Sequence, residues 1–334
     1  MMLRFAAIFN LYFHYQRPGI LEPVANNRLA TNEVIILRSY KRWCITLVFS
    51  AVMTMLSAPG QAVIILDSTF KKSGFQKAES LALSPQFASL LFLDGESASG
   101  SGAWIGNYQG HGYVLTAGHL FPPGTKASDY RYLTLDGTVY QGDRVFIHPL
   151  WNENHEDRTG YDVAIVRLTS EVTDAGPQPA LYSGSAEKGQ QLTFMGYGWR
   201  GTGKKGEDTS IDTGNRPAAA VGLIESVENA VHPVPEEGDA GNYLGVWLPK
   251  EDGSLANPLD DEGIIKPFSP LAGILGSGDS GGPAWIKTNK GWSIAAVSSD
   301  GSGNAAYGDV SWFSRVTGLT RWIKQIVPTA RFVE

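Results

Sequence analysis

Three short segments carry residues that together could activate a hydroxyl group for nucleophilic attack. His119 ends the run Val-Leu-Thr-Ala-Gly-His, and Asp162 opens the run Asp-Val-Ala-Ile-Val-Arg-Leu. Ser280 lies within Gly-Ser-Gly-Asp-Ser-Gly-Gly-Pro, residues 276–283. A serine hydroxyl is a weak nucleophile until a base takes its proton, and histidine suits that task because its pKa lies near neutrality. A carboxylate on the second ring nitrogen would fix the histidine tautomer.

The glycine-rich segment around Ser280 could also stabilise a negatively charged oxygen. The tetrahedral intermediate of acyl transfer needs hydrogen-bond donors that are already in place. The backbone amides of Gly278 and Ser280 are the candidates for this oxyanion hole. Glycine at position 278 can adopt a conformation closed to other residues, and it leaves space for a substrate carbonyl. The three segments together predict hydrolysis through a covalent acyl-serine.

These segments resemble the chymotrypsin–trypsin family of serine proteases. The run ending at His119 is similar to that family's Thr-Ala-Ala-His, with glycine for the second alanine, and the run from Asp162 is similar to its Asp-Ile-Ala-Leu-Leu. Residues 278–283 match its Gly-Asp-Ser-Gly-Gly-Pro in full. The order His, Asp, Ser is that of chymotrypsin and differs from subtilisins and α/β-hydrolases. The resemblance extends over roughly residues 86–328, and bacterial secreted members with few cysteines look most similar.

The resemblance implies an all-β fold of two perpendicular six-stranded Greek-key β-barrels with a C-terminal α-helix. We expect a peptidase domain over 86–328, with the first barrel at about 86–175, the second at about 176–313 and the helix at about 314–327. His119 and Asp162 would come from the first barrel and Ser280 from the second. The implied substrate is a protein or peptide, and no cofactor or metal is required.

Two alternatives to a serine endopeptidase remain open. A protease-fold binding protein without catalytic activity is one, although such proteins usually lose a triad residue and none is missing here. An esterase-like hydrolase with the same triad is the other, and the Asp-Ser-Gly-Gly context of Ser280 disfavours it.

The hydrophobic pattern independently favours a β-rich fold. From about residue 86, short apolar runs alternate with Gly, Asp, Asn and Pro, and no strands alternate with helices of 10–15 residues. Near the C-terminus, apolar residues between Val316 and Ile326 recur on one helical face until Pro328. Residues 199–217 are polar and glycine-rich, and residues 228–270 are acidic and proline-rich. Both segments are interpreted as loops inserted in the second barrel.

Substrate selectivity is predicted from three positions that the resemblance places near Ser280. Ile274, six residues before the nucleophile, would lie at the base of the primary pocket and favours an apolar side chain there. Ser298 and Asp300 lie where the family has the strand that pairs with the substrate backbone. Asp300 could instead attract a basic side chain.

Asp279 is interpreted as structural. In the family, this aspartate pairs with the N-terminal amine that activation cleavage releases, yet no Ile-Val-Gly-Gly segment occurs here. Val63, freed by removal of a signal peptide, is one candidate partner. The alternative is that another donor satisfies Asp279.

The N-terminal region reads as a signal for export. Basic residues at 38–42 precede an uncharged apolar run over 43–57, and Gly60 and Ala62 occupy positions −3 and −1 of a cleavage site. The run is shorter than the ~20 residues that span a bilayer. We therefore expect an extension and signal peptide at 1–62, with the true start downstream of Met1, and an N-terminal segment of the mature chain at 63–85. An uncleaved anchor and a buried helix are the alternatives.

Composition limits the compartment and the partners. The predicted protein is secreted or periplasmic in a bacterium, without stable membrane insertion after cleavage. The single cysteine, Cys44, excludes an intrachain disulfide and a cysteine-based metal site. The net charge of −6 argues against nucleic acid as a partner. His155 in a metal site and calcium binding by residues 234–270 are weaker readings than solvated loops. The sequence predicts no oligomeric state.

Overall fold

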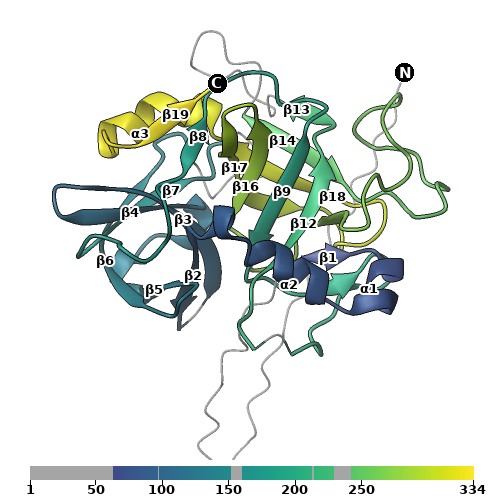
Figure 1. Cartoon of the computed structure of the whole chain (residues 1–334), viewed down its shortest axis with the longest axis horizontal. Coiled ribbons are helices and arrows are strands. Elements are labelled where there is room, and N and C mark those ends of the chain that lie inside the picture. The colour runs from purple at the N-terminus through teal and green to yellow at the C-terminus, as the bar shows by residue number, and fades with distance from the viewer. Residues whose placement is uncertain (1–62, 97, 152–159, 213, 229–241) are drawn as a thin grey trace, which may run out of the picture. The chain divides into compact units, whose positions relative to one another are not determined.

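The computed structural model describes residues 63–96, 98–151, 160–212, 214–228 and 242–334 (Figure 1). Six antiparallel strands form a closed barrel in the order β2-β3-β4-β7-β6-β5. Their bounds are β2 Leu90–Gly95, β3 Ser99–Tyr108, β4 His111–Thr116, β5 Tyr130–Thr134, β6 Val139–Ile147 and β7 Ala164–Leu168. This first barrel contains the strands that precede His119 and follow Asp162.

The β3–β4 hairpin shows how local sequence directs the first barrel. Gln109 and Gly110 connect the strands, and both have positive φ (52° and 79°). Two such residues form the turn whose twist matches paired antiparallel strands. Beyond the turn, side chains from all six strands alternate into a buried cluster that includes Leu91, Val114 and Val166. Each fully buried side chain of this size contributes about 1.5–3 kcal/mol.

A second sheet supplies the other half of the fold. Its hydrogen-bonded order is β12-β9-β16-β17-β18-β14-β13. Only Ile224 and Glu225 separate β12 from β13, so one bent segment pairs with β9 on one side and with β14 on the other, and the sheet curves into a half-barrel. The bounds are β9 Gln191–Gly196, β12 Ala218–Leu223, β13 Ser226–Glu228, β14 Tyr243–Trp247, β16 Pro283–Thr288, β17 Gly291–Gly301 and β18 Val310–Arg315. The predicted two-barrel all-β fold is confirmed.

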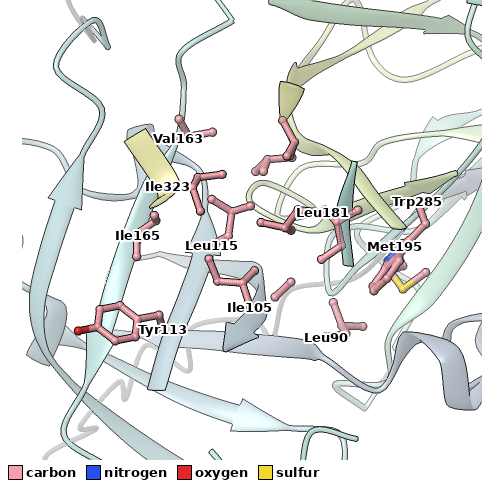
Figure 2. Close-up of a cluster of buried hydrophobic side chains, with 14 of the residues drawn as sticks. Leu90, Ile105, Tyr113, Leu115, Val163, Ile165, Leu181, Met195, Trp285 and Ile323 are labelled. Atoms are coloured by element: carbon pink, nitrogen blue, oxygen red, sulfur yellow. The ribbon is translucent and has the colours of Figure 1, made fainter. Parts of the chain in front are cut away.

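A shared apolar core joins the two barrels. Figure 2 shows Leu115 and Ile165 of the first barrel in the same cluster as Met195 and Trp285 of the second. Ile323 joins this cluster from the C-terminal helix α3, Thr320–Ile326, which follows the 3-10 turn η4, Thr317–Leu319. The predicted C-terminal helix is therefore confirmed. After it, β19 (Arg331–Val333) pairs with β8 (Ala180–Tyr182), which pairs with β17.

The segment that follows residue 62 packs against the second barrel. It forms β1 (Ile64–Ile65), α1 (Asp67–Ser73), α2 (Gln76–Ala82) and the 3-10 turn η1 (Pro85–Phe87), and α2 lies against β12. β1 pairs in parallel with β10 (Gly201–Thr202) and antiparallel with β15 (Gly273–Ile274). β10 in turn pairs with β11 (Gly206–Glu207). The first residues of this segment therefore form a strand of the small sheet that contains β10, β11 and β15.

The structure corrects the interpretation of two segments as loops. Residues 199–217 contain the β10–β11 hairpin. Within 228–270, Tyr243–Trp247 form β14, a buried barrel strand, although the acidic surroundings disguise its apolar run. Glu228 ends β13, and residues 248–270 are irregular.

The predicted signal peptide lies outside the described residues. Among the residues that are described, no helix combines the length and the apolar character needed to cross a membrane.

Candidate active site

Strand pairing brings His119 and Asp162 together. β4 pairs with β7 so that Thr116 lies opposite Ala164, which places the end of one strand beside the start of the other. His119 follows β4 in the 3-10 turn η2, Gly118–Leu120, and Asp162 lies two residues before β7. The two residues are 43 positions apart in sequence, yet their side chains are in contact.

Asp162 fixes both the backbone and the ring of His119. Its Oδ1 accepts the His119 backbone N–H at 2.8 Å, and its Oδ2 lies 2.7 Å from His119 Nδ1. With the Nδ1 proton directed at the carboxylate, Nε2 is the ring nitrogen that remains to accept a proton. Burial by itself lowers the pKa of His119, but the hydrogen bond and charge of Asp162, with a contribution from Asp300, outweigh it and raise the pKa above its usual value.

Asp162 is itself held by partners that sequence reasoning missed. It is 1% exposed, and its Oδ2 also accepts the Ser299 hydroxyl at 2.7 Å. Ser314 donates its hydroxyl to the Asp162 backbone carbonyl at 3.3 Å. Tyr243 lines the same cavity as Ser299. The only sequence signal for Ser299 was its place next to Ser298 in the segment that resembles the family's substrate strand.

A buried histidine supports the segment just before Asp162. His148 stacks on Tyr161 with 4.6 Å between ring centroids and packs edge-on against Trp322 of α3. Burial lowers the pKa of His148 to about 4, so this ring is neutral at physiological pH. Its role is to pack beneath the Asp162 segment.

The turn that carries Ser280 has an unequal pattern of backbone hydrogen bonds. Five of the seven successive amides from 276 to 282 donate within the protein. The Gly276 amide donates to Asp279 Oδ2, and the Ser277 amide donates to Glu207 Oε1. The Asp279 amide donates to the Gly276 carbonyl, the Gly281 amide to the Ser298 carbonyl, and the Gly282 amide to the Asp279 carbonyl. The amides of Gly278 and Ser280 donate to no acceptor in the part of the chain that the structure describes. These two donors were predicted as the oxyanion hole.

Two glycines allow this turn to form. Gly278 has φ +93°, and Gly281 has φ +81°, a region that residues with a Cβ rarely adopt. At Gly281 a Cβ would also lie 2.2 Å from the Ser101 carbonyl. Ser101 donates its amide to the Ser280 carbonyl at 2.8 Å, so the first barrel directly holds the turn of the second.

The Asp279 side chain points away from the cavity into a fully buried site. Its carboxylate accepts the amides of Gly276 at 2.8 Å, Gly198 at 2.9 Å and Val63 at 3.0 Å. Burial raises the pKa of Asp279 to about 7, against the effect of these three donors. Val63, the first described residue, has φ +52°, which a β-branched residue rarely adopts.

A cavity of about 820 Å³ joins His119, Gly278 and Ser280. Its further lining comes from loops and strands of both barrels: Trp151, Asp162, Glu207, Tyr243, Leu275, Gly276, Ser277, Ser299, Asp300, Gly301, Ser302, Gly303 and Ala305. A second cavity, lined by Glu96, Ser99 and Asp129 among others, shares His119, Gly278 and Ser280 with the first. Ser280 therefore lines both cavities.

Of the three selectivity positions, only Asp300 lines this cavity. Ile274 is 1% exposed and packs with Ile64 and Leu66, because β15 pairs with β1 and turns the side chain into that cluster. Ser298 is fully buried, and its backbone N–H and C=O are already bonded to Gly282 and Gly281. The expectations that Ile274 forms the pocket base and that Ser298 pairs with substrate are thus not met.

Trp151 and Glu207 are cavity residues that no sequence motif indicated. Trp151 lies against Gly118, where a Cβ would come within 2.9 Å of its ring, which explains glycine beside His119 in place of the family's alanine. Glu207 reaches the cavity from the β10–β11 hairpin. Among the described residues, no group of three or more His, Cys, Asp or Glu side chains is arranged to hold a metal ion, and His155 lies outside them.

Comparison with known proteins agrees with this geometry. The family model for the trypsin-like peptidase domain matches residues 100–291, which include His119, Asp162 and Ser280. A search of curated proteins found no significant match. The family match covers more than half of the chain, and the chain belongs to the trypsin-like peptidase family.

Proposed function

We propose that this protein is a serine endopeptidase that cleaves peptide bonds through an acyl-enzyme on Ser280. The observation that carries the proposal is that one cavity contains the aspartate-bound His119, Ser280 and the two open amides of the Ser280 turn. Each element needed for acyl transfer therefore faces the same space.

The proposed reaction uses each group once in each half. His119 Nε2 takes the proton of Ser280 Oγ as the oxygen attacks the substrate carbonyl carbon. The carbonyl oxygen becomes negatively charged and accepts hydrogen bonds from the Gly278 and Ser280 amides. His119 then gives its proton to the leaving amine, and the acyl-serine forms. In the second half, His119 activates water in the same way, and Asp162 stabilises the imidazolium in both halves.

The two cavities support cleavage within a chain in preference to removal of terminal residues. Both are lined by His119 and Ser280, and the rest of their lining comes from different residues. A substrate strand could therefore continue on both sides of the scissile bond.

The second part of the proposal concerns export and processing. The signal-like sequence at 38–62 supports secretion to the periplasm or the medium, with cleavage after Ala62. Cleavage there would convert the Val63 amide, 3.0 Å from Asp279, into a positively charged amine. This pairing of charges supports the proposed cleavage after Ala62.

Labelling with a fluorophosphonate probe tests the enzymatic part of the proposal. We expect Ser280 to be labelled in the mature protein, and a Ser280→Ala variant to be neither labelled nor able to cleave an unfolded protein substrate. Thermal melting of both proteins checks that the variant is folded. Folded wild-type protein without labelling would favour a binding protein, whereas cleavage of simple esters but not of peptides would favour an esterase.

A further inference from the structure

Ser277, the residue before the proposed oxyanion donor Gly278, makes three hydrogen bonds with the segment 198–207. Glu207 Oε1 accepts the Ser277 backbone N–H at 2.5 Å, and Glu207 Oε2 accepts the Ser277 hydroxyl at 3.1 Å. Trp199 donates its backbone N–H to the Ser277 carbonyl at 2.6 Å. All the backbone polar groups and the side chain of Ser277 are thereby bound to this one segment.

The Ser277 carbonyl and the Gly278 N–H belong to the same peptide group, so whatever orients one orients the other. This peptide group rotates through ψ of Ser277 and φ of Gly278, and glycine at 278 allows that rotation with little steric cost. Rotation of this peptide would turn the Gly278 N–H away from the cavity and the carbonyl toward it. The turn therefore needs a restraint from outside to keep the donor in place.

The hairpin that carries Glu207 is well anchored for this task. Asp67 of α1 accepts the Thr202 hydroxyl at 3.0 Å and the Lys204 N–H at 2.8 Å. The Glu207 N–H donates to the Asn304 carbonyl at 3.1 Å. The Glu207 backbone is thus fixed from two directions, and its carboxylate can transmit that position to Ser277.

We propose that Glu207 is a positioning residue for the oxyanion hole, holding Ser277 so that the Gly278 amide faces the reacting carbonyl. The inference rests on the proposed protease activity. Glu207 itself touches neither nucleophile nor oxyanion in this role, and acts through Ser277. In this proposal the polar, glycine-rich segment 199–217 contributes to the active site through Glu207.

The competing role for Glu207 is direct binding of a basic substrate side chain, because the residue also lines the cavity. The two roles differ in what they change. A positioning residue affects kcat for every substrate, whereas a binding residue affects KM for basic substrates alone.

The test compares Glu207→Ala, Glu207→Gln and Asp208→Ala in the mature enzyme. Asp208 is the matched control, because it is the next carboxylate along the hairpin and bonds to Lys205 and Ser210 instead of Ser277. For Glu207→Ala we expect kcat to fall about 10- to 100-fold with KM little changed, below the roughly 100- to 1,000-fold loss on removing a donor itself. Glu207→Gln retains an oxygen acceptor for Ser277 and should recover most of kcat, and Asp208→Ala should match wild type.

Each kinetic measurement uses two peptides that differ only in arginine or its uncharged analogue citrulline before the scissile bond. A peptide aldehyde, whose hemiacetal oxygen would occupy the oxyanion hole, should bind Glu207→Ala more weakly in proportion to the loss of kcat. Unchanged kcat in Glu207→Ala, or a loss confined to KM for the arginine peptide, overturns the inference while leaving the protease activity intact. Wild-type protein that neither reacts with a fluorophosphonate nor cleaves either peptide overturns both.

Discussion

The two halves of the candidate active site are built in different ways. His119 and Asp162 lie at the ends of neighbouring strands of a closed barrel, β4 and β7, and one carboxylate joins them directly. The turn of Ser280 lies between β15 and β16, and much of its surroundings consists of two-residue strands. The acid–base half depends on strand register, and the nucleophile half depends on contacts from distant segments.

The turn that carries Ser280 is bonded by residues far from it in the sequence. Asp279, next to the nucleophile, is bonded by Val63 and Gly198. Ser277 is bonded by Glu207, more than 60 residues earlier in the chain. A strand pair is stabilised by several hydrogen bonds, so one substitution removes only part of its stability. A long-range contact made by one side chain is removed entirely when that side chain is replaced. The nucleophile half therefore depends on more distant parts of the chain than the acid–base half does.

The largest effect is expected from breaking the acid–base half. Asp162→Asn keeps the size of the side chain but removes its charge, so the His119 ring would favour the wrong tautomer. We expect kcat to fall by about 10⁴, measured by peptide hydrolysis with the active-site concentration determined separately. Ser299→Ala, which removes one hydrogen bond to the same carboxylate, is the matched milder variant. An equal loss in both would contradict the assigned role of Asp162.

A smaller but still large effect is expected from the N-terminus, in the nucleophile half. A chain beginning at Val63 would place an ammonium group beside Asp279, whereas a chain that keeps Ala62 offers only an amide. Removing one partner of a buried ion pair costs about 3–5 kcal/mol. We therefore expect the chain that keeps Ala62 to have at least about 100-fold lower kcat/KM. Equal activity would mean that the three amide donors suffice for Asp279.

The same pair of chains should differ in how stability depends on pH. Burial raises the pKa of Asp279 to about 7 when Val63 offers an amide. The folded chain that keeps Ala62 then holds a proton that the unfolded chain has released, so its free energy of unfolding decreases as pH rises from about 4 to 7. An ammonium at Val63 stabilises the charged carboxylate and removes most of this decrease. Urea unfolding at several pH values measures the difference.

The same contrast explains what could be predicted from sequence. Short sequence motifs identify His119, Asp162, Gly278 and Ser280, because the residues next to them in the chain are typical of the family. The β-rich character could be predicted because apolar runs and turn residues alternate locally, whereas the two barrels were implied by the resemblance to the family. β14 was missed because its buried run, residues 243–247, follows a strongly acidic stretch.

The residues that could not be predicted reach the site by long-range packing. Glu207 and Tyr243 carry no motif, and both reach the cavity only in the folded chain, where Glu207 meets the turn at Ser277. Ile274 was misplaced for a related reason. Counting six residues back from Ser280 assumes that this wall of the pocket follows the family's path, but here residue 274 pairs with β1 and its side chain enters a separate apolar cluster.

The smallest effect tests whether the two halves influence each other through charge. Asp300 belongs to β17 of the second barrel, yet its charge is one of the causes that raise the pKa of His119. His119 must be neutral to accept the serine proton, so kcat/KM should rise with pH through the pKa of His119 in the free enzyme. Asp300→Asn removes a negative charge and lowers that pKa. The acidic limb of the pH profile should therefore move to lower pH, and the ratio of kcat/KM at pH 6 to that at pH 8 should increase.

The control for this measurement is Glu262→Gln, an equal change of charge at an exposed residue that is not among the causes of the His119 shift. Added salt separates the effect further, because it screens exposed charges more strongly than buried pairs. At high ionic strength the Asp300→Asn profile should approach that of wild type, while the contribution of Asp162 to the His119 pKa persists. A profile that does not move in Asp300→Asn at low salt would show that the acid–base half is electrostatically independent of the pocket. The raised pKa of His119 would then belong to Asp162 alone.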